Sequence, residues 1–193
     1  MARPQFKGRG AREQNRTDRR TEYAAGIAPH LSGLVQPENP AERALLVGDD
    51  LVPLAERLAK QLPDGAVALV TTEFDRWEAA CSALAAYPNV TVVQELAELG
   101  DPDGFPTAPW TIGVLLVPAY LGQKTVLLVM NELVSWLRMG AALYVGGSRM
   151  YEWNITSERL SFLAGPLSTL YIKDPIRVVK GIAKGGSWAG SRA

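Results

Sequence analysis

The sequence predicts an α/β fold built on a doubly wound, mostly parallel β-sheet with one antiparallel strand near its C-terminal end. From residue 44 onward, short aliphatic runs alternate with amphipathic stretches. The runs are nearly continuous rather than alternating with polar residues, which is typical of strands that helices cover on both faces. The last two runs are separated by two residues, a link that permits only a hairpin between antiparallel strands.

The first half of this pattern predicts three strands and two helices. The strands are expected over 44–47, 66–71 and 90–94. A helix is expected to begin near Asp50, and a second over 74–86. The apolar side chains of the second helix recur at helical spacing, which predicts a buried face formed by Phe74, Trp77, Cys81 and Leu84.

The second half predicts the strands that complete the sheet. A strand over 111–117 leads to a helix over 123–138, which Gly140 is expected to terminate. A strand over 142–147 and a short helix over 157–164 follow. The closing strands over 167–173 and 176–183 are joined through Asp174 and Pro175, so the last should run antiparallel to its predecessor.

Composition and charge divide the chain into four parts. The 193 residues suffice for one domain with attached segments, and a hydrophobic fraction of 47% excludes a wholly disordered chain. Residues 1–22 have seven basic and three acidic side chains and few large apolar ones, which predicts a basic flexible arm. Residues 23–42, with three prolines, read as a connector without regular structure. The folded domain is expected over 43–186, followed by a tail over 187–193.

The final third of the chain resembles a known family of enzymes. The segments NELVSWLRMGAALYVGGSR (131–149) and SERLSFLAGPLSTLYIKDPIRVVKGIA (157–183) resemble class I AdoMet-dependent methyltransferases. The likeness is greatest to the methyltransferase-small type, the bacterial rRNA guanine-N2 methyltransferases. It implies a Rossmann-like, seven-stranded sheet with a reversed final strand, S-adenosyl-L-methionine (AdoMet) as cofactor and RNA as substrate. In this family one domain can carry a degenerate cofactor site.

A sheet of this kind binds nucleotides beyond the carboxyl ends of its strands. The resemblance implies that Gly48 and Asp49 hold the methionine part of AdoMet, Glu73 its ribose hydroxyls, and Gln94 or Glu95 its adenine. The first loop, VGDDLVP, has one glycine where the family has two or three. Its two carboxylates are equally explained as a cap at a helix N-terminus, so both interpretations remain open.

The fourth loop carries the candidate catalytic residues. Family members that methylate base amines have asparagine, two prolines and an aromatic residue there, and the aromatic ring stacks on the flipped base. This chain reads Val117-Pro118-Ala119-Tyr120. The resemblance therefore assigns Pro118 and Tyr120 to the target base, but Val117 replaces the polar group that orients the amine. The alternative is that Tyr120 packs as an ordinary side chain at a strand end.

Several other functions are excluded. A single Cys81 and a single His30 leave no disulfide framework and no cysteine or multi-histidine metal site. A serine-nucleophile elbow and a phosphate-binding Walker loop are absent. The longest uncharged apolar run, 112–121, is shorter than the ~20 residues that span a bilayer. The lone cysteine and the lack of a signal-like segment indicate a cytoplasmic protein without membrane contact.

Both basic ends suggest RNA as the partner, because arginine and lysine neutralise phosphates. The alternatives are a solubilising tail and an acidic protein surface. The leading hypothesis is a methyltransferase acting on RNA, ribosomal RNA in particular. Its rivals are a non-catalytic RNA- or ribosome-associated protein with a degenerate site, and one half of an enzyme that works with a partner subunit or as a homo-oligomer. The candidate RNA-binding side chains of the arm are Arg3, Lys7, Arg9, Arg12, Arg16, Arg19 and Arg20.

Overall fold

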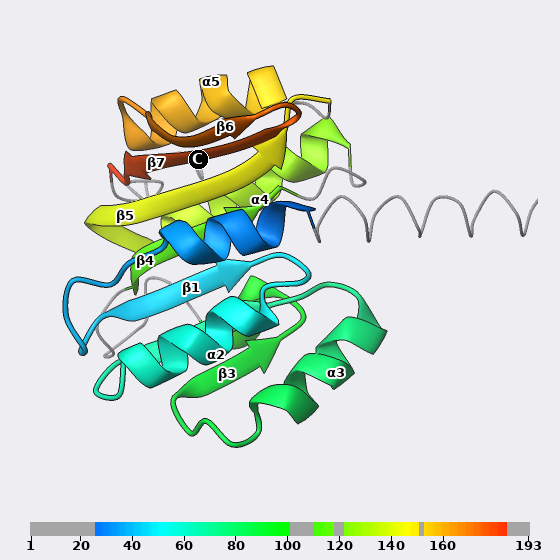
Figure 1. Ribbon diagram of the computed structural model, residues 1–193, viewed down its shortest axis with the longest axis vertical. Helices are drawn as coiled ribbons and strands as arrows, with labels where there is room; N and C mark the ends of the chain where they lie inside the picture. The colour runs from blue at the N-terminus through cyan, green and yellow to red at the C-terminus, as the bar shows by residue number, and fades with distance from the viewer. Residues whose placement is uncertain (1–25, 101–109, 118–121, 151–152, 185–193) are drawn as a thin grey trace, which may run out of the picture.

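A single seven-stranded sheet organises the molecule (Figure 1). The computed structural model describes residues 26–100, 110–117, 122–150 and 153–184. Within them the strand order is β3-β2-β1-β4-β5-β7-β6. The strands are β1 (Arg43–Val47), β2 (Ala66–Val70), β3 (Val90–Val93), β4 (Trp110–Leu116), β5 (Leu137–Ser148), β6 (Ser168–Lys173) and β7 (Ile176–Ile182).

Strand direction confirms the predicted fold class. The first five strands pair in parallel, and β7 is antiparallel to both of its neighbours, β5 and β6. The two-residue link predicted to form a hairpin does so, and it places β7 between β5 and β6. The sheet is therefore doubly wound and mostly parallel, with one reversed strand near the C-terminus.

Three helices cover one face of the sheet. They are a helix over residues 26–34, α2 (Val52–Gln61) and α3 (Phe74–Leu84). The first is drawn in dark blue in Figure 1, in front of the sheet beside α2. Alternate strand residues such as Leu46, Leu69 and Val114 are fully buried beneath these helices.

The opposite face is covered by α4 (Gln123–Ser135), α5 (Trp153–Ala164) and a 3₁₀ turn, η1 (Leu96–Leu99). Met130 and Leu133 of α4 and Leu160 of α5 pack there against Leu115 and Val145 of the sheet. The central strands β1, β2, β4 and β5 thus contribute side chains to two cores, which explains their nearly continuous aliphatic sequences.

The helix over 26–34 differs from the sequence-based interpretation, which placed a connector without regular structure over 23–42. Its residues Ile27 and Leu31 are buried and lie against Gly146 of β5, where an added Cβ would be 2.8 Å from Ile27 Cγ2. Arg57 of α2 fixes its far end. The Nη2 atom of that arginine donates hydrogen bonds to the carbonyl oxygens of Ser32 (2.7 Å) and Val35 (2.6 Å).

Two further expectations were wrong in detail. The helix expected over 123–138 ends at Ser135, and β5 already begins at Leu137, so Gly140 lies inside a strand with φ = 85°. On α3 the buried side chains are Ala80 and Leu84. Phe74, predicted to be buried, has 59% of its surface exposed because α3 covers the edge of the sheet.

Candidate functional site

A cavity of about 180 Å³ lies at the carboxyl ends of β1 to β4. Its wall includes Gly48 and Asp49 after β1, and Gln94 and Glu95 after β3. Leu116 of β4 and Glu132 of α4 close it from the other side. Four of the five residues that the sequence assigns to the cofactor therefore border one space, contributed by loops that are far apart in the chain.

Gly48 is required by the sheet itself. Its φ of 137° lies in the region that favours glycine, and a Cβ there would be 2.8 Å from the Cβ of Leu116 on the neighbouring strand β4. Its backbone N–H donates to the carbonyl of Val70 at 3.0 Å. The loop after β1 is thus held close against both adjacent strands, and this glycine has a structural role whether or not a ligand binds.

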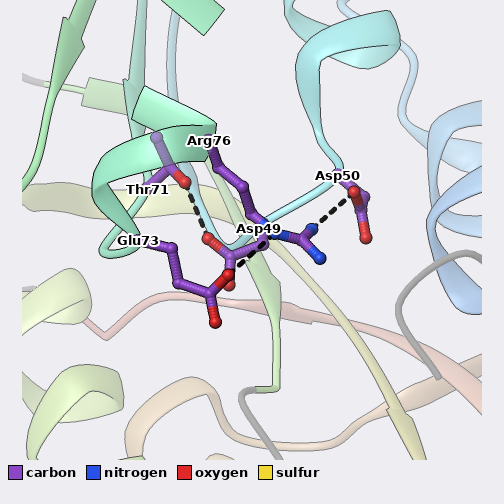
Figure 2. Close-up of polar contacts among 5 residues, drawn as sticks. All are labelled: Asp49, Asp50, Thr71, Glu73 and Arg76. Atoms are coloured by element: carbon purple, nitrogen blue, oxygen red, sulfur yellow. Dashed lines mark hydrogen bonds and ion pairs between the residues drawn. The ribbon is translucent and has the colours of Figure 1, made fainter. Parts of the chain in front are cut away.

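Asp49 is buried and receives a hydrogen bond from the residue that follows β2. The hydroxyl of Thr71 donates to its Oδ1 at 2.6 Å (Figure 2). This bond joins the loops that follow β1 and β2. Because a buried carboxylate is costly without partners, the threonine helps to keep Asp49 at the cavity wall.

The remaining two carboxylates of this region, Asp50 and Glu73, are paired with Arg76 of α3 (Figure 2). The guanidinium donates from Nη1 to Asp50 Oδ1 at 2.6 Å and from Nε to Glu73 Oε2 at 3.0 Å. The arginine side chain is 24% exposed. Asp50 has φ = 65°, a conformation that aspartate adopts more readily than most residues. The arginine therefore fixes both loops to the start of α3.

The electrostatics of this cluster favour the charged arginine. Partial burial acts to lower the pKa of Arg76. The hydrogen bond that Arg76 donates to Asp50 and the negative charges of Asp50, Asp49 and Glu73 outweigh it, so the pKa is raised above its ordinary value. Glu73 stands where the sequence placed it, after β2, but it does not border the cavity. Its carboxylate is held by an arginine three residues further along the same helix.

A second, larger hollow of about 550 Å³ lies on the face of the sheet that α2 and α3 cover. Asp50 and Arg76 line it, together with small side chains such as Ala28 and Ala80 from the surrounding helices. Thr71 borders this hollow as well. The ion pair between Asp50 and Arg76 consequently faces this second hollow rather than the cavity at the strand ends.

The cavity at the strand ends is acidic. Asp49, Glu95 and Glu132 contribute to its wall, and no lysine or arginine does so among the residues that the structure describes. Burial against the cavity wall raises the pKa of Glu132, and the negative charge of Glu95 adds to the effect. Glu98 fixes the adjoining loop, since its Oε1 accepts hydrogen bonds from the backbone N–H groups of Gln94 and Glu95, both at 2.9 Å.

The remaining candidate residues lie outside the described parts of the chain. These are Pro118 and Tyr120 after β4, and the seven basic residues of the arm. Three side chains of the site were not singled out from the sequence: Thr71, Arg76 and Glu132. A signal for Arg76 was present, because residues three apart on a helix are neighbours and Glu73 precedes it by three. Within the described ranges, no helix has both the length and the apolar character needed to cross a bilayer.

No protein-family model matches this chain, and no curated protein sequence is significantly similar to it. Solved structures do match. The 16S rRNA N2 G1207 methyltransferase RsmC of T. thermophilus, in complex with AdoMet and guanosine, is 23% identical with a TM-score of 0.61. The match covers 83% of this chain and 39% of that protein, so this chain spans well under half of its length.

Two further structures extend the comparison. The N-methyltransferase NodS of Bradyrhizobium japonicum is 14% identical with a TM-score of 0.59, and the match covers 87% of this chain and 96% of that one. The fibrillarin pre-rRNA processing protein of Methanococcus jannaschii is 16% identical with a TM-score of 0.57, covering 78% of this chain and 70% of that one. At these identities the likeness establishes the fold. The chain has the Rossmann-like, seven-stranded fold of the class I methyltransferases.

Proposed function

We propose that this protein binds AdoMet in the cavity at the strand ends and acts as an RNA methyltransferase, with ribosomal RNA as the substrate class. The observation that carries the proposal is the common cavity of Gly48, Asp49, Gln94 and Glu95. These residues come from two loops about 45 residues apart in the chain, and they meet where open α/β sheets bind their ligands.

The chemistry of the cavity wall fits AdoMet better than a phosphorylated cofactor. AdoMet carries a sulfonium and an amino group and no phosphate, whereas a dinucleotide would bring phosphates next to Asp49, Glu95 and Glu132. A cation is favoured beside carboxylates for the same reason that a phosphate is repelled. When bound, AdoMet would supply the methyl group, and the carboxylates of this chain would orient its hydroxyl and amino groups.

Support for RNA comes from the sequence and from two of the similar structures. Residues 173–193 have five basic side chains and one acidic one, and the N-terminal arm is basic as well. RsmC is a 16S rRNA methyltransferase, and fibrillarin is a pre-rRNA processing protein. The ends of the chain would bind phosphates, and Tyr120, after β4, would meet the target base.

A second candidate function is a non-catalytic RNA- or ribosome-associated protein that keeps the fold. Two observations favour it. The cavity, at about 180 Å³, is smaller than the 300–1,000 Å³ usual for ligand pockets, and Glu73 is bound by Arg76 rather than directed into the cavity.

Calorimetric titration of the full chain with AdoMet and with S-adenosylhomocysteine separates the two candidates. We expect binding of both, and an at least tenfold loss of affinity in Glu95→Gln, which keeps the size of the side chain but removes its charge. Glu73→Gln tests whether Glu73 leaves Arg76 to hold the ribose, in which case it too weakens binding.

The outcomes are distinct. Absence of heat and of a thermal shift at about millimolar ligand contradicts the methyltransferase proposal and favours the non-catalytic candidate. Binding that Glu95→Gln leaves unchanged means that the ligand lies elsewhere. Binding that depends on Glu95 but not on Glu73 supports the cavity as the site and makes the contact between Glu73 and Arg76 purely structural.

A further inference from the structure

An exposed phenylalanine lies on α5, an element that does not line the cavity at the strand ends. Phe162 has 67% of its surface exposed, whereas Leu160 and Ala164 on either side of it in the sequence are buried in the core. A single exposed apolar side chain is common on protein surfaces and needs no explanation by itself. The side chains that surround this ring distinguish it.

Two cations lie over the ring of Phe162, in cation–π contact with it. The guanidinium carbon of Arg159 lies 5.0 Å from the ring centroid, and the ammonium nitrogen of Lys184 lies 6.0 Å from it. Arginine precedes the phenylalanine by three residues on the same helix, and Lys184 follows β7. The positive charges are therefore brought to the ring from two separate elements of the fold.

Both cations are held in place by uncharged groups. Asn131 Oδ1 on α4 accepts hydrogen bonds from Nε and Nη2 of Arg159, at 2.9 Å and 2.6 Å. Lys184 donates from Nζ to the carbonyl of Phe162 at 3.0 Å, and its backbone N–H donates to the carbonyl of Leu163 at 3.1 Å. These contacts position the cations without neutralising them.

The charges consequently remain available to an anion. Among the described residues, neither Arg159 nor Lys184 forms an ion pair with a carboxylate. The acidic side chain closest in sequence is Glu158, which is exposed and precedes Phe162 by one helical turn. Two cations against one carboxylate leave the surface of Phe162, Arg159 and Lys184 positive.

We propose that Phe162 is a stacking platform for an unpaired nucleotide base, and that Arg159 and Lys184 bind the phosphates on either side of that base. Exposed aromatic rings next to basic side chains are how proteins bind single-stranded nucleic acid, because every base has a face that stacks. Duplexes offer their bases far less readily. This inference rests on the RNA part of the proposed function and names a surface of the folded domain that would engage the strand.

Fluorescence anisotropy with the full chain and a labelled single-stranded oligouridylate of about 12 nucleotides tests the proposal. We expect Phe162→Ala to weaken binding about five- to 100-fold, whereas Phe162→Trp retains it. Phe74→Ala is the matched control: Phe74 is also an exposed phenylalanine on a helix, but Glu73 and Asp75 flank it, and its removal should leave the affinity unchanged.

The salt dependence identifies the phosphate contacts. Arg159→Ala and Lys184→Ala should each reduce the slope of log K against log salt concentration by about 0.7, and Phe162→Ala should leave that slope unaltered. Circular dichroism of each variant checks that the fold is retained.

The possible results separate this inference from the proposal on which it rests. If the unmodified chain does not bind the oligonucleotide, both this inference and the RNA part of the proposed function are wrong. If it binds but Phe162→Ala binds equally well, this inference alone is overturned, and the exposed ring is better explained as a protein contact. The inference is supported if affinity for the oligonucleotide falls in Phe162→Ala, Arg159→Ala and Lys184→Ala but not in the control variant Phe74→Ala.

Discussion

Two helices of this fold each carry an exposed phenylalanine and an arginine held by a neighbouring side chain, but with opposite electrostatic results. On α3, Arg76 is bound by the carboxylates of Asp50 and Glu73. On α5, Arg159 is bound by the neutral amide of Asn131. The first arginine is neutralised and serves the fold, whereas the second is oriented and keeps its charge. The identity of the acceptor thus decides whether an anchored arginine can attract a ligand.

The largest expected effect is on stability, and it tests whether Arg76 contributes more to the fold than Arg159 does. Arg76→Ala should lower the free energy of unfolding by about 1–2 kcal/mol, because Asp49, Asp50 and Glu73 would remain close together without a counter-charge. Arg159→Ala should cost about 0.5–1 kcal/mol, since it removes hydrogen bonds to a neutral amide and a contact with an exposed ring but leaves no carboxylate without a counter-charge. Urea unfolding of both variants measures the difference. Equal losses would mean that the two arginines contribute alike to stability.

A smaller effect on RNA affinity is expected when Arg159 of α5 receives a carboxylate as its partner, as Arg76 of α3 has. Asn131→Asp preserves an oxygen acceptor for Arg159 but makes it a carboxylate. Affinity for single-stranded RNA should fall about threefold, and the salt slope should decrease by about 0.7, while stability is maintained or slightly increased. Undiminished RNA affinity in this variant would show that the uncancelled charge of Arg159 is not what attracts the strand.

The smallest effect concerns Glu132, the residue next to Asn131 on α4. Its pKa is raised above 4.5 by burial, with Glu95 adding to the shift. The native state therefore holds this proton at a higher pH than the unfolded chain does. Stability is lost as the pH rises from about 4.5 through the raised value, and no loss occurs below that range. The variant Glu132→Gln should not show this loss. Its free energy of unfolding should equal that of the unmodified chain near pH 4 and exceed it by about a few tenths of a kcal/mol near pH 7. Thermal unfolding across this range checks the sign, and a variant that is less stable at neutral pH would contradict it.

The sheet could be predicted because burial on both faces of a strand is visible in the residue pattern of that strand alone. Val114 and Leu115 are adjacent and face opposite cores, so the strand reads as a continuous aliphatic run. The helix over 26–34 was not recognised because Pro29 and the later prolines were given more weight than the spacing of Ile27, Leu31 and Val35. That spacing, four residues apart, was the available signal.

The meeting of the candidate residues at one cavity could be predicted, but the ion pairs between their side chains could not. The cavity brings together Gly48, Asp49, Gln94 and Glu95 because topology alone places strand ends side by side. Which carboxylate an arginine selects depends on loop conformation, here the left-handed backbone of Asp50, and a sequence does not state that conformation. The exposure of Phe74 was missed for a related reason, since helical spacing identifies one face without saying how much sheet lies beneath it.

The helix over 26–34 sets a practical limit on how this chain can be shortened. It shields Gly146 of β5 and stacks His30 on Tyr171 of β6, with ring centroids 4.1 Å apart. A protein beginning at residue 43 would expose the surface of β5 and β6 that this helix covers and would tend to aggregate. Trimming intended to remove only the basic arm must therefore stop before Gly26; otherwise a damaged core would be mistaken for a lost binding partner.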